Sequence, residues 1–356
     1  MADRTRAKRY QRASLLTAIT EIFKAAQLEE EKAAIVAQVL IEADMLAHRT
    51  HGLALAPMYL EAATSGAMTR TGKPVTVSDR GACVTWRGRR LPGPWLMHKA
   101  VDLALDRAAT YGMASVAISD SHHVGALAAY LQAATERGYM LFIASSVPSL
   151  KGVAPFGGTT PVFTPNPIAA GIPTGGDPIL IDVSASITTI NSARQLARSG
   201  GQFPQDWAID AHGLPTRDPK VLLEQGGSLL PAGGLDHGHK GYAWALLAEA
   251  FSQGLSGYGR ADKPAGTSMS VFIQAIDPGA FGGVDDFQRQ MNHLAANCRA
   301  SAPLLGVDKV RLPGEQALRS RRIALCDGVE LSNEIIQGLL PWATRFSVQF
   351  PDELPS

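Results

Sequence analysis

The stretch "HRTHG", at positions 48 to 52, carries the residues of this sequence that are best suited to proton chemistry. His51 follows a hydroxyl residue, Thr50, and precedes a glycine. A neutral imidazole can take a proton from an alcohol and return it, because its pKa lies near working pH. We therefore expect His51 to transfer a proton and Thr50 to hold or relay it. Two alternatives remain on spacing alone. His51 could be an ordinary turn histidine, or it could bind a metal with His48, although no acidic third ligand is evident.

A second histidine motif, "SHHVG" at 121 to 125, lies between an apolar strand and a helix. Backbone N–H groups at the start of a helix can bind a phosphate group, which would place His123 beside a cofactor. Ser121 could instead cap that helix, and the two interpretations are compatible.

Three more polar groups stand at the ends of expected elements, where side chains can face a cleft while their backbone stays anchored. Asn166 lies between two prolines in "TPNP", a stiff loop that could present its amide to a ligand. Asp182 ends the strand in "IDVSAS" and could orient an imidazole, or cap the next helix. Lys240 in "GHKGY" precedes an apolar helix and could bind a phosphate or a carboxylate, or be a solvated lysine.

Several common functional motifs are absent from the sequence. It contains no G-x-G-x-x-G, no G-x-x-x-x-G-K-[ST], no H-E-x-x-H and no G-x-S-x-G. An ordinary Rossmann dehydrogenase and a P-loop enzyme are therefore disfavoured.

The hydrophobic pattern predicts a helical N-terminal region that holds the first motif. One helix is capped by Ser14, a second spans about 29–44, and a third stops at Gly66. "HRTHG" falls in the connection between the second and third helices.

The period then changes to an alternation of strands and helices, which indicates an α/β layer. The stretch 155–178 is rich in Gly, Pro and Thr and cannot be regular for long, and the stretch from 201 to about 238 is rich in loops. We expect an Asp327–Gly328 turn within 322–331. The expected strands are 75–79, 82–86, 113–119, 139–147, 179–186 and 268–277, and the expected helices are 97–112, 125–138, 188–200, 241–257, 285–300 and 332–340.

Composition excludes several functional classes. The 356 residues are 46% hydrophobic with a net charge of +1, so a sizeable core is expected and no attraction to nucleic acid or to an anionic membrane. The basic first residues should form a solvated arm. Cys83, Cys298 and Cys326 show no CxxC spacing, which argues against disulfides and structural zinc. With no secretory signal and no apolar run of about 18 residues, we expect a cytoplasmic protein.

Six segments, taken in order, resemble the malate/L-lactate dehydrogenase family of non-Rossmann oxidoreductases over residues 14–345. These are "THGL", "HHVGALAAY", "TPNPIAAGIP", "PILIDVSAS", "GHKGYAWALLAEAFSQGLSG" and "VFIQAIDPGAF". The family includes ureidoglycolate and sulfolactate dehydrogenases, diketogulonate reductase, and the piperideine-2-carboxylate/pyrroline-2-carboxylate reductases.

The resemblance implies an α/β fold, a non-Rossmann three-layer α/β/α arrangement with a mixed sheet, plus a small N-terminal helical unit. We expect a helical unit over 1–75 that packs with the C-terminal helices, a cofactor- and substrate-binding domain over 76–330, and a C-terminal helix and tail over 331–356. The resemblance also implies a homodimer with active sites near the subunit interface, and NAD or NADP as cofactor. The sequence does not separate the two cofactors, because the usual ribose reader belongs to the Rossmann fold.

The resemblance also assigns roles to particular residues. His51 would be the proton donor, with Thr50 and Asp182 as its relay, and some members use the equivalent of His123 instead. The residues expected to line the cofactor are His122, His123, Val124, Gly125, Ala126, Ser146, Thr164, Asn166, Ile181, Val183, His239, Lys240 and Gly241.

Two departures from the family affect the substrate. Many members carry arginines where this chain has Leu46 and Leu55, so Arg49 or Lys240 would have to bind a substrate carboxylate. The expected reaction is hydride transfer between nicotinamide and C2 of a small 2-oxo or 2-hydroxy acid, or alternatively of a cyclic 2-imino acid. More remote alternatives are a hydrolase with a metal on His48, His51 and His123, and a nucleotide-binding relative without turnover.

Overall fold

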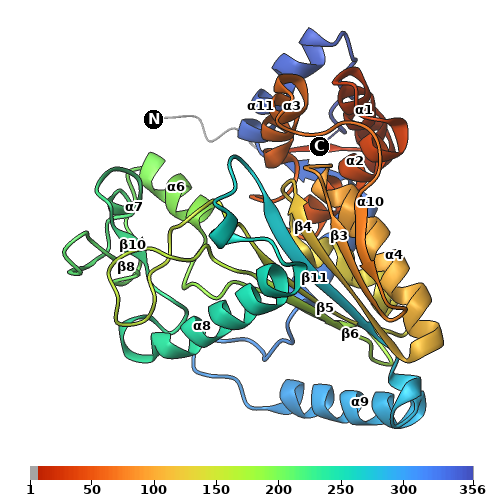
Figure 1. Cartoon of the computed structure of the whole chain (residues 1–356), viewed down its shortest axis with the longest axis vertical. Coiled ribbons are helices and arrows are strands. Elements are labelled where there is room, and N and C mark those ends of the chain that lie inside the picture. Colours follow the sequence, from red (N-terminus) through yellow and green to blue (C-terminus); the bar gives the residue numbers. More distant parts are fainter. Residues whose placement is uncertain (1–6, 356) are drawn as a thin grey trace.

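The computed structural model describes residues 7–355, and a seven-stranded sheet forms its centre (Figure 1). Only the β3–β4 pair of this sheet is parallel, and every other neighbouring pair is antiparallel. A doubly wound nucleotide-binding sheet has mostly parallel neighbours. The predicted mixed, non-Rossmann α/β fold is therefore confirmed. In spatial order the strands are β2 (Val75–Asp79), β3 (Cys83–Arg87), β4 (Met113–Ser121), β11 (Met269–Ile276), β5 (Met140–Ser146), β6 (Ile168–Ile172) and β7 (Ile179–Val183).

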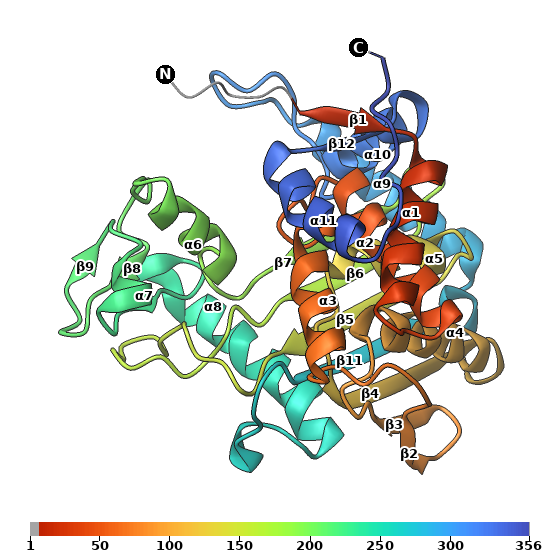
Figure 2. The ribbon, with the colours of Figure 1, turned by 90° about the horizontal axis from the view of Figure 1, so that it is seen from above.

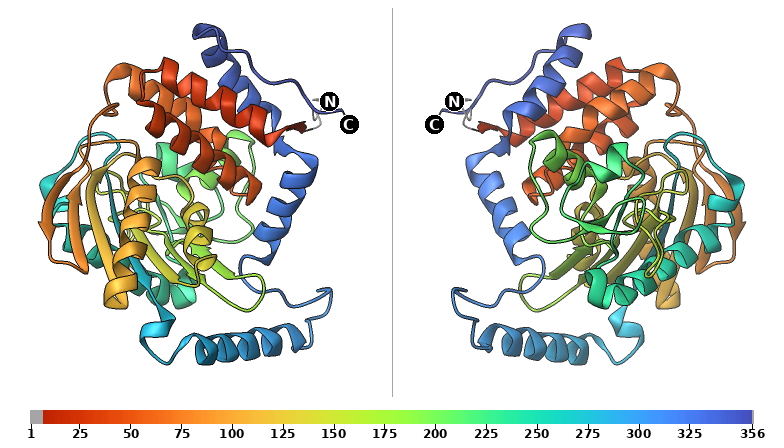
Figure 3. Two further views of the ribbon diagram at one scale, coloured as in Figure 1. Left: turned by 90° about the vertical axis from the view of Figure 1, so that its right-hand side faces the viewer. Right: turned by 90° about the vertical axis from the view of Figure 1, so that its left-hand side faces the viewer.

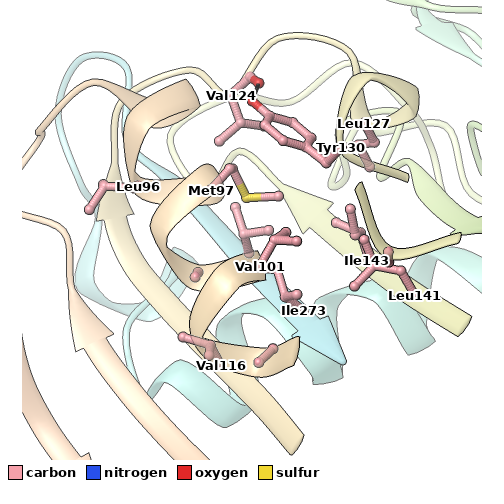
Figure 4. Close-up of a cluster of buried hydrophobic side chains, with 14 of the residues drawn as sticks. Leu96, Met97, Val101, Val116, Val124, Leu127, Tyr130, Leu141, Ile143 and Ile273 are labelled. Atoms are coloured by element: carbon pink, nitrogen blue, oxygen red, sulfur yellow. Dashed lines mark hydrogen bonds between the residues drawn. The ribbon is translucent and has the colours of Figure 1, made fainter. Parts of the chain in front are cut away.

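Helices cover both faces of the sheet, because the side chains of the central strand β11 alternate between the two faces. Ile273 belongs to the apolar cluster formed with helix α4, where Met97 and Val101 lie against the sheet (Figure 4). Phe272 points to the other face and stacks on Phe251 with ring centroids 4.8 Å apart. The first face carries α4 (Gly93–Tyr111), η2 (Leu127–Tyr130) and α5 (Leu131–Thr135), and the second carries α8 (Gly234–Glu249) and the π-helical turn η3 (Ala250–Gly254).

The first and last helices pack together beside the sheet (Figure 3). One apolar cluster joins the N-terminal helices to the C-terminal ones, and strand β1 (Lys8–Tyr10) pairs with β12 (Val329–Leu331). The domain limits at 75/76 and 330/331 stay a prediction. The helices of this unit are α1 (Arg12–Ala25), α2 (Glu30–Met45), η1 (Leu53–Leu55), α3 (Ala56–Ser65), α10 (Glu315–Asp327) and α11 (Asn333–Arg345).

A small lobe stands to one side of the sheet (Figure 2). It has its own apolar cluster, in which Phe163, Phe203 and Leu229 are buried, and a three-stranded sheet in the order β10–β8–β9. Its elements are α6 (Ile190–Arg198), β8 (Ala208–Ile209), β9 (Pro215–Thr216), α7 (Val221–Glu224) and β10 (Ser228–Leu229). Elsewhere lie η4 (Arg260–Asp262), η5 (Pro278–Ala280) and α9 (Val284–Ala300).

Several local predictions were wrong. Strand β6, within the stretch 155–178, was not predicted; pairing with β5 and β7 satisfies the backbone of this short apolar run between prolines. Helix α10 was not predicted at all. Helix α8 begins at Gly234, so Lys240 lies inside the helix and not before it. The expected helix 125–138 is reduced to η2 and the five-residue α5.

The N-terminal expectations also need correction. Helix α1 begins at Arg12, and the Ser14 hydroxyl donates to the Gln11 side chain from within the first turn, so Ser14 is not the cap. The predicted solvated arm is paired sheet at β1, and its first six residues lie outside the described part of the chain.

The end of α2 contains a strained residue just before the first histidine motif. Ala47 has φ +63°, and the N–H groups of Ala47 and His48 donate to the carbonyls of Asp44 and Ala43, which is a Schellman motif. Glycine adopts this conformation without the clash that Cβ introduces. We expect Ala47→Gly to raise the free energy of unfolding by about 0.5–1 kcal/mol, measured by urea denaturation. An equal or lower value would contradict this strain.

Candidate active site

The first histidine motif is a tight turn between α2 and η1. The His51 N–H donates to the His48 carbonyl at 2.8 Å, so the two histidines stand at the two ends of one four-residue turn. The Leu53 N–H then donates to the Asp44 carboxylate at 2.8 Å. A Cβ on Gly52 would come within 2.4 Å of that carboxylate, so only glycine fits after His51.

The His51 ring is partly buried and is set by its neighbour in the chain. Its Nδ1 lies 2.9 Å from the Thr50 hydroxyl oxygen, as the spacing predicted. Burial, assisted by the charge of His48, lowers the pKa of His51 to about 4. The imidazole is therefore neutral at pH 7.

The two motifs meet at their histidines. The rings of His51 and His123 stack with centroids 6.0 Å apart and an angle of 25°. The Gly125 N–H donates to His123 Nδ1 at 3.1 Å, and Tyr59 donates to the His123 carbonyl at 2.9 Å. Since Nδ1 is an acceptor, the proton of neutral His123 lies on Nε2, and burial lowers the pKa of this residue to about 3. Tyr59 was missed in the sequence, where nothing links α3 to the second motif.

His122 is buried beside this pair. Its ring meets the Tyr59 ring edge-on at 5.3 Å, and burial lowers its pKa to about 4. Its Nδ1 is buried without a hydrogen-bond partner among residues 7–355. Ser121 belongs to β4 and donates to the His122 carbonyl at 2.8 Å, so the predicted helix cap by Ser121 was wrong.

Asp182 faces the second motif, and no hydrogen bond joins it to His51 within the described part of the chain. Its carboxylate accepts the Ala128 N–H at 2.8 Å. This N–H lies at the start of η2, where the backbone was expected to bind a phosphate group. Burial raises the pKa of Asp182, and the charge of His48 opposes this shift. The cap of the following helix is Thr189, whose hydroxyl accepts the Ser192 N–H at 3.1 Å. A direct Asp182–His51 pair is thus absent because β7 ends opposite η2.

The polar atoms of Asn166 are used inside the protein and do not face a ligand. Asn166 is fully buried with φ +45°, accepts from Thr164 at 2.8 Å and donates to Glu249 at 2.9 Å. Glu249 in turn pairs with Arg260 at 2.8 Å, and the Ser146 hydroxyl accepts from the Gln253 amide. Three predicted cofactor residues therefore belong to a buried network that fixes α8 and η3 to the sheet. Glu249, Gln253 and Arg260 were missed, because the network joins segments about 80 to 110 residues apart.

The remaining predicted residues are spread over two regions. His239 and Lys240 are exposed on α8, while Gly241 is buried with no room for a Cβ. Arg49 is held by Glu330 of β12 at 2.7 Å, so its guanidinium group is already paired at the surface. Leu46, Leu55, Val124 and Ala126 are buried, Ile181 is partly buried and Val183 is half exposed.

One cavity lies away from the histidines. It measures about 580 Å³ and is lined by charged residues that include Asp177, Lys309, Arg311 and Arg319. Asp177 precedes β7, whereas Asp182 stands near the other end of that strand. Residues 7–355 contain no group of three His, Cys, Asp or Glu side chains placed to hold a metal, so the three-histidine ligand set is not assembled. No helix of this part of the chain is long and apolar enough to span a membrane.

Asp44 gives the site a pH dependence that the sequence did not reveal. The carboxyl is buried, Oδ1 has no partner among the described residues, and burial raises the pKa from 3.8 to about 7. Between pH 4 and 7 the folded state thus holds more protons than the unfolded state, and stability falls as the pH rises through this window. In the wild type the free energy of unfolding should fall by about 2–4 kcal/mol more than in Asp44→Asn between pH 4.5 and 8, measured by denaturation at each pH. A variant with the wild-type slope would exclude Asp44 as its source.

Comparison with known proteins shows the family of this chain. The family model described as malate/L-lactate dehydrogenase matches residues 10–340. An L-lactate dehydrogenase of Cupriavidus necator is 31% identical, covering 93% of this chain and 96% of the relative. A Δ1-pyrroline-2-carboxylate/Δ1-piperideine-2-carboxylate reductase of Pseudomonas syringae pv. tomato is 30% identical, covering 91% and 93%. The structure of malate dehydrogenase from Entamoeba histolytica shares the fold, with a TM-score of 0.91 and 24% identity over 98% and 100% of the two chains. With its model matched over nearly the whole chain, this oxidoreductase belongs to the malate/L-lactate dehydrogenase family.

Proposed function

We propose that the protein transfers a hydride between the nicotinamide of NAD(P)H and C2 of a small 2-oxo or 2-hydroxy acid. One observation carries the proposal: a neutral His51 lies beside Thr50, stacked on His123, in a member of this family. A proton donor and a hydride donor must reach the same carbonyl group, and the two stacked histidines mark where this can happen.

The protonation state of His51 decides how it acts. With a pKa of about 4, only about one molecule in a thousand carries the imidazolium form at pH 7. Neutral His51 can instead release the Nε2 proton to the substrate oxygen while Nδ1 takes the hydroxyl proton of Thr50, whose oxygen recovers a proton from solvent. In the oxidation direction both transfers reverse. Thr50 is suited to this, because a hydroxyl group both donates and accepts.

A nicotinamide cofactor fits some of the expected residues and not others. When bound, it supplies the hydride. His122 offers a buried nitrogen without a partner in the described chain, and Lys240 offers an exposed cation, so these two could hold polar groups of the cofactor. The side-chain polar groups of Asn166 and Thr164 are occupied by the buried network. NAD or NADP remains open.

We also propose a homodimer, because the second half of helix α8 is apolar on its outer face. Small residues such as Gly238, Gly241 and Ala245 face the protein, while Trp244 and Leu247 point outward, 49% and 40% exposed. Large apolar side chains on an outer face are typical of an interface. A second copy of the chain is the occupant we expect, with the protein in the cytoplasm, where free Cys83, Cys298 and Cys326 stay reduced.

We expect the wild type to sediment as a dimer and Trp244→Glu/Leu247→Glu to sediment as a monomer at micromolar concentration. The glutamates introduced by these substitutions would be buried in the contact between the two copies without a polar partner, so dimer formation becomes unfavourable. Analytical ultracentrifugation measures this, with Phe281→Glu, at an exposed site on another element, as the control. A wild-type monomer would contradict the dimer.

The relative from Pseudomonas syringae supports reduction of a cyclic 2-imino acid as a second candidate. The two reactions differ in the atom that is protonated, oxygen or nitrogen. Oxidation of NADH and NADPH should therefore be followed with pyruvate, oxaloacetate, Δ1-pyrroline-2-carboxylate and Δ1-piperideine-2-carboxylate. Turnover of at least one acid supports the proposal, and no turnover with either cofactor would refute it.

A further inference from the structure

Tyr59 is a fully buried residue of this site to which the reaction above gives no role. It lies on α3, eight residues after His51, and its hydroxyl group reaches the second histidine motif. The hydroxyl donates to the His123 carbonyl at 2.9 Å, and its oxygen also lies 3.0 Å from Nδ1 of the His123 ring. One hydroxyl group therefore meets both the backbone and the side chain of His123.

Tyr59 connects the two histidines because it belongs to the same short segment as His51. Helix η1 follows the His51 turn, and α3 follows η1 without a loop between them. Gly125 approaches from the second motif, since a Cβ there would stand 3.6 Å from the His51 carbonyl oxygen, and its N–H donates to His123 Nδ1 at 3.1 Å. Contacts of Tyr59 and Gly125 thus hold the His123 ring in its stack with His51.

These contacts also fix the nitrogen atom through which His123 can donate a hydrogen bond. The Gly125 N–H and the Tyr59 hydroxyl group both lie within 3.1 Å of Nδ1, so the ring proton stays on Nε2. No hydrogen bond within residues 7–355 uses this Nε2–H, and His123 is only partly buried. An N–H group that has no protein partner and is not closed off from solvent can donate to a ligand oxygen.

The role of the Tyr59 hydroxyl group can be separated from that of its ring. The ring meets the His122 ring edge-on at 5.3 Å and the His123 ring at 6.0 Å, and phenylalanine would keep both contacts. Tyr130 offers a matched comparison, because its hydroxyl group is also buried and donates to the carbonyl of Val124 in the same segment. In the described part of the chain no hydrogen bond joins Tyr130 to a histidine ring.

We propose that Tyr59 is a positioning residue, which acts through His123 and keeps its Nε2–H as a donor to an oxygen of the ligand bound beside His51. The inference rests on the proposed function. The acceptor is a carbonyl-type oxygen, which both the 2-oxo acid and the carboxamide of the nicotinamide carry. His123 keeps its proton throughout the reaction, whereas His51 transfers one, so the two stacked rings have different roles.

The first test compares Tyr59→Phe with Tyr130→Phe, using the best acid found. We expect kcat/KM to fall by about 10-fold in Tyr59→Phe and by less than about threefold in Tyr130→Phe, because only the first variant loses a donor to the His123 ring. A higher KM for the acid would identify its carboxylate as the acceptor, a lower kcat its C2 oxygen, and a higher KM for the cofactor the carboxamide. An unchanged kcat/KM in Tyr59→Phe would overturn the proposal.

A double variant tests whether Tyr59 acts through His123. Once His123→Gln has removed the ring, adding Tyr59→Phe should lower kcat/KM by less than about twofold more, because residues that act as one unit are not additive. A further loss of about 10-fold in the double variant would mean that Tyr59 acts on another group, contrary to the proposal.

A third test does not depend on turnover. Nitrogen NMR of protein with isotope-labelled histidine shows which ring nitrogen carries the proton, and the His123→Gln spectrum identifies the His123 signals. We expect the proton on Nε2 in the wild type, and a shift of the Nδ1 signal in Tyr59→Phe but not in Tyr130→Phe. A proton on Nδ1 in the wild type, or an unchanged Nδ1 signal in Tyr59→Phe, would refute the inference. If the wild type reduces none of the acids, the proposed function fails, and this spectrum still decides whether Tyr59 holds the His123 ring.

Discussion

Replacing His51 by alanine should lower kcat for the 2-oxo acid by about a thousandfold, which is within the range for loss of a general acid or base. The substitution removes both nitrogen atoms, so Thr50 has no partner at 2.9 Å and the substrate oxygen has no proton donor. The KM for the cofactor should change little. Steady-state kinetics in both directions measure the effect, and full turnover by the variant would remove His51 from the reaction.

The pH profile of the wild type provides a second test of the same residue. The pKa of His51 is lowered to about 4, so its basic form persists well below the usual range of imidazole. Oxidation of the 2-hydroxy acid should therefore lose the contribution of His51 only as the pH falls through about 4. Thr50→Val, which keeps the shape of the side chain and removes the hydroxyl group, should reduce kcat in both directions without moving this limit. A loss of activity centred near pH 6.5 would show that the His51 ring is exposed to water in solution and keeps the ordinary pKa of an imidazole.

Gly93→Ala should have the largest effect on the fold around the second motif. A Cβ at Gly93 would lie 2.2 Å from the His123 carbonyl oxygen and 2.4 Å from that of His122. Both neighbours are backbone atoms, so α4 or the histidine segment must move. We expect a loss of about 3 kcal/mol and a fall in Tm of roughly 4 °C, with kcat reduced because His123 and its stacking on His51 are displaced.

The matched control is Gly282→Ala, where a Cβ would meet nothing within 4 Å and the backbone is not left-handed. Differential scanning calorimetry and kinetics of both variants separate the clash of the new Cβ with the histidine segment from the general effect of replacing a glycine by alanine. Equal Tm values for Gly93→Ala and the wild type would show that α4 can withdraw from the histidine segment without loss.

Local patterns in the sequence were sufficient for the elements and for the nearest partners in the site. Short runs of apolar and β-branched residues predicted six of the seven strands of the main sheet, with β3 displaced by one residue. Gly and hydroxyl residues marked the turn that carries the first histidine motif. The Thr50–His51 contact follows from adjacency in the chain. Each of these depends on interactions between residues close in sequence, which composition and spacing record directly.

Only the tertiary structure decided which distant residues meet. Asn166 was expected to face a ligand, yet a network with Glu249 and Arg260 uses its amide, because α8 packs over the loop after β5. Asp182 was expected to orient His51, yet its carboxylate accepts the Ala128 N–H. These contacts join residues that are 54 and 83 positions apart in the chain, and the sequence cannot show which of several polar neighbours a side chain will reach. The sequence alone determined the family and the fold class and led to the proposal that His51 transfers a proton, whereas burial and packing set the charge and the partners of that histidine.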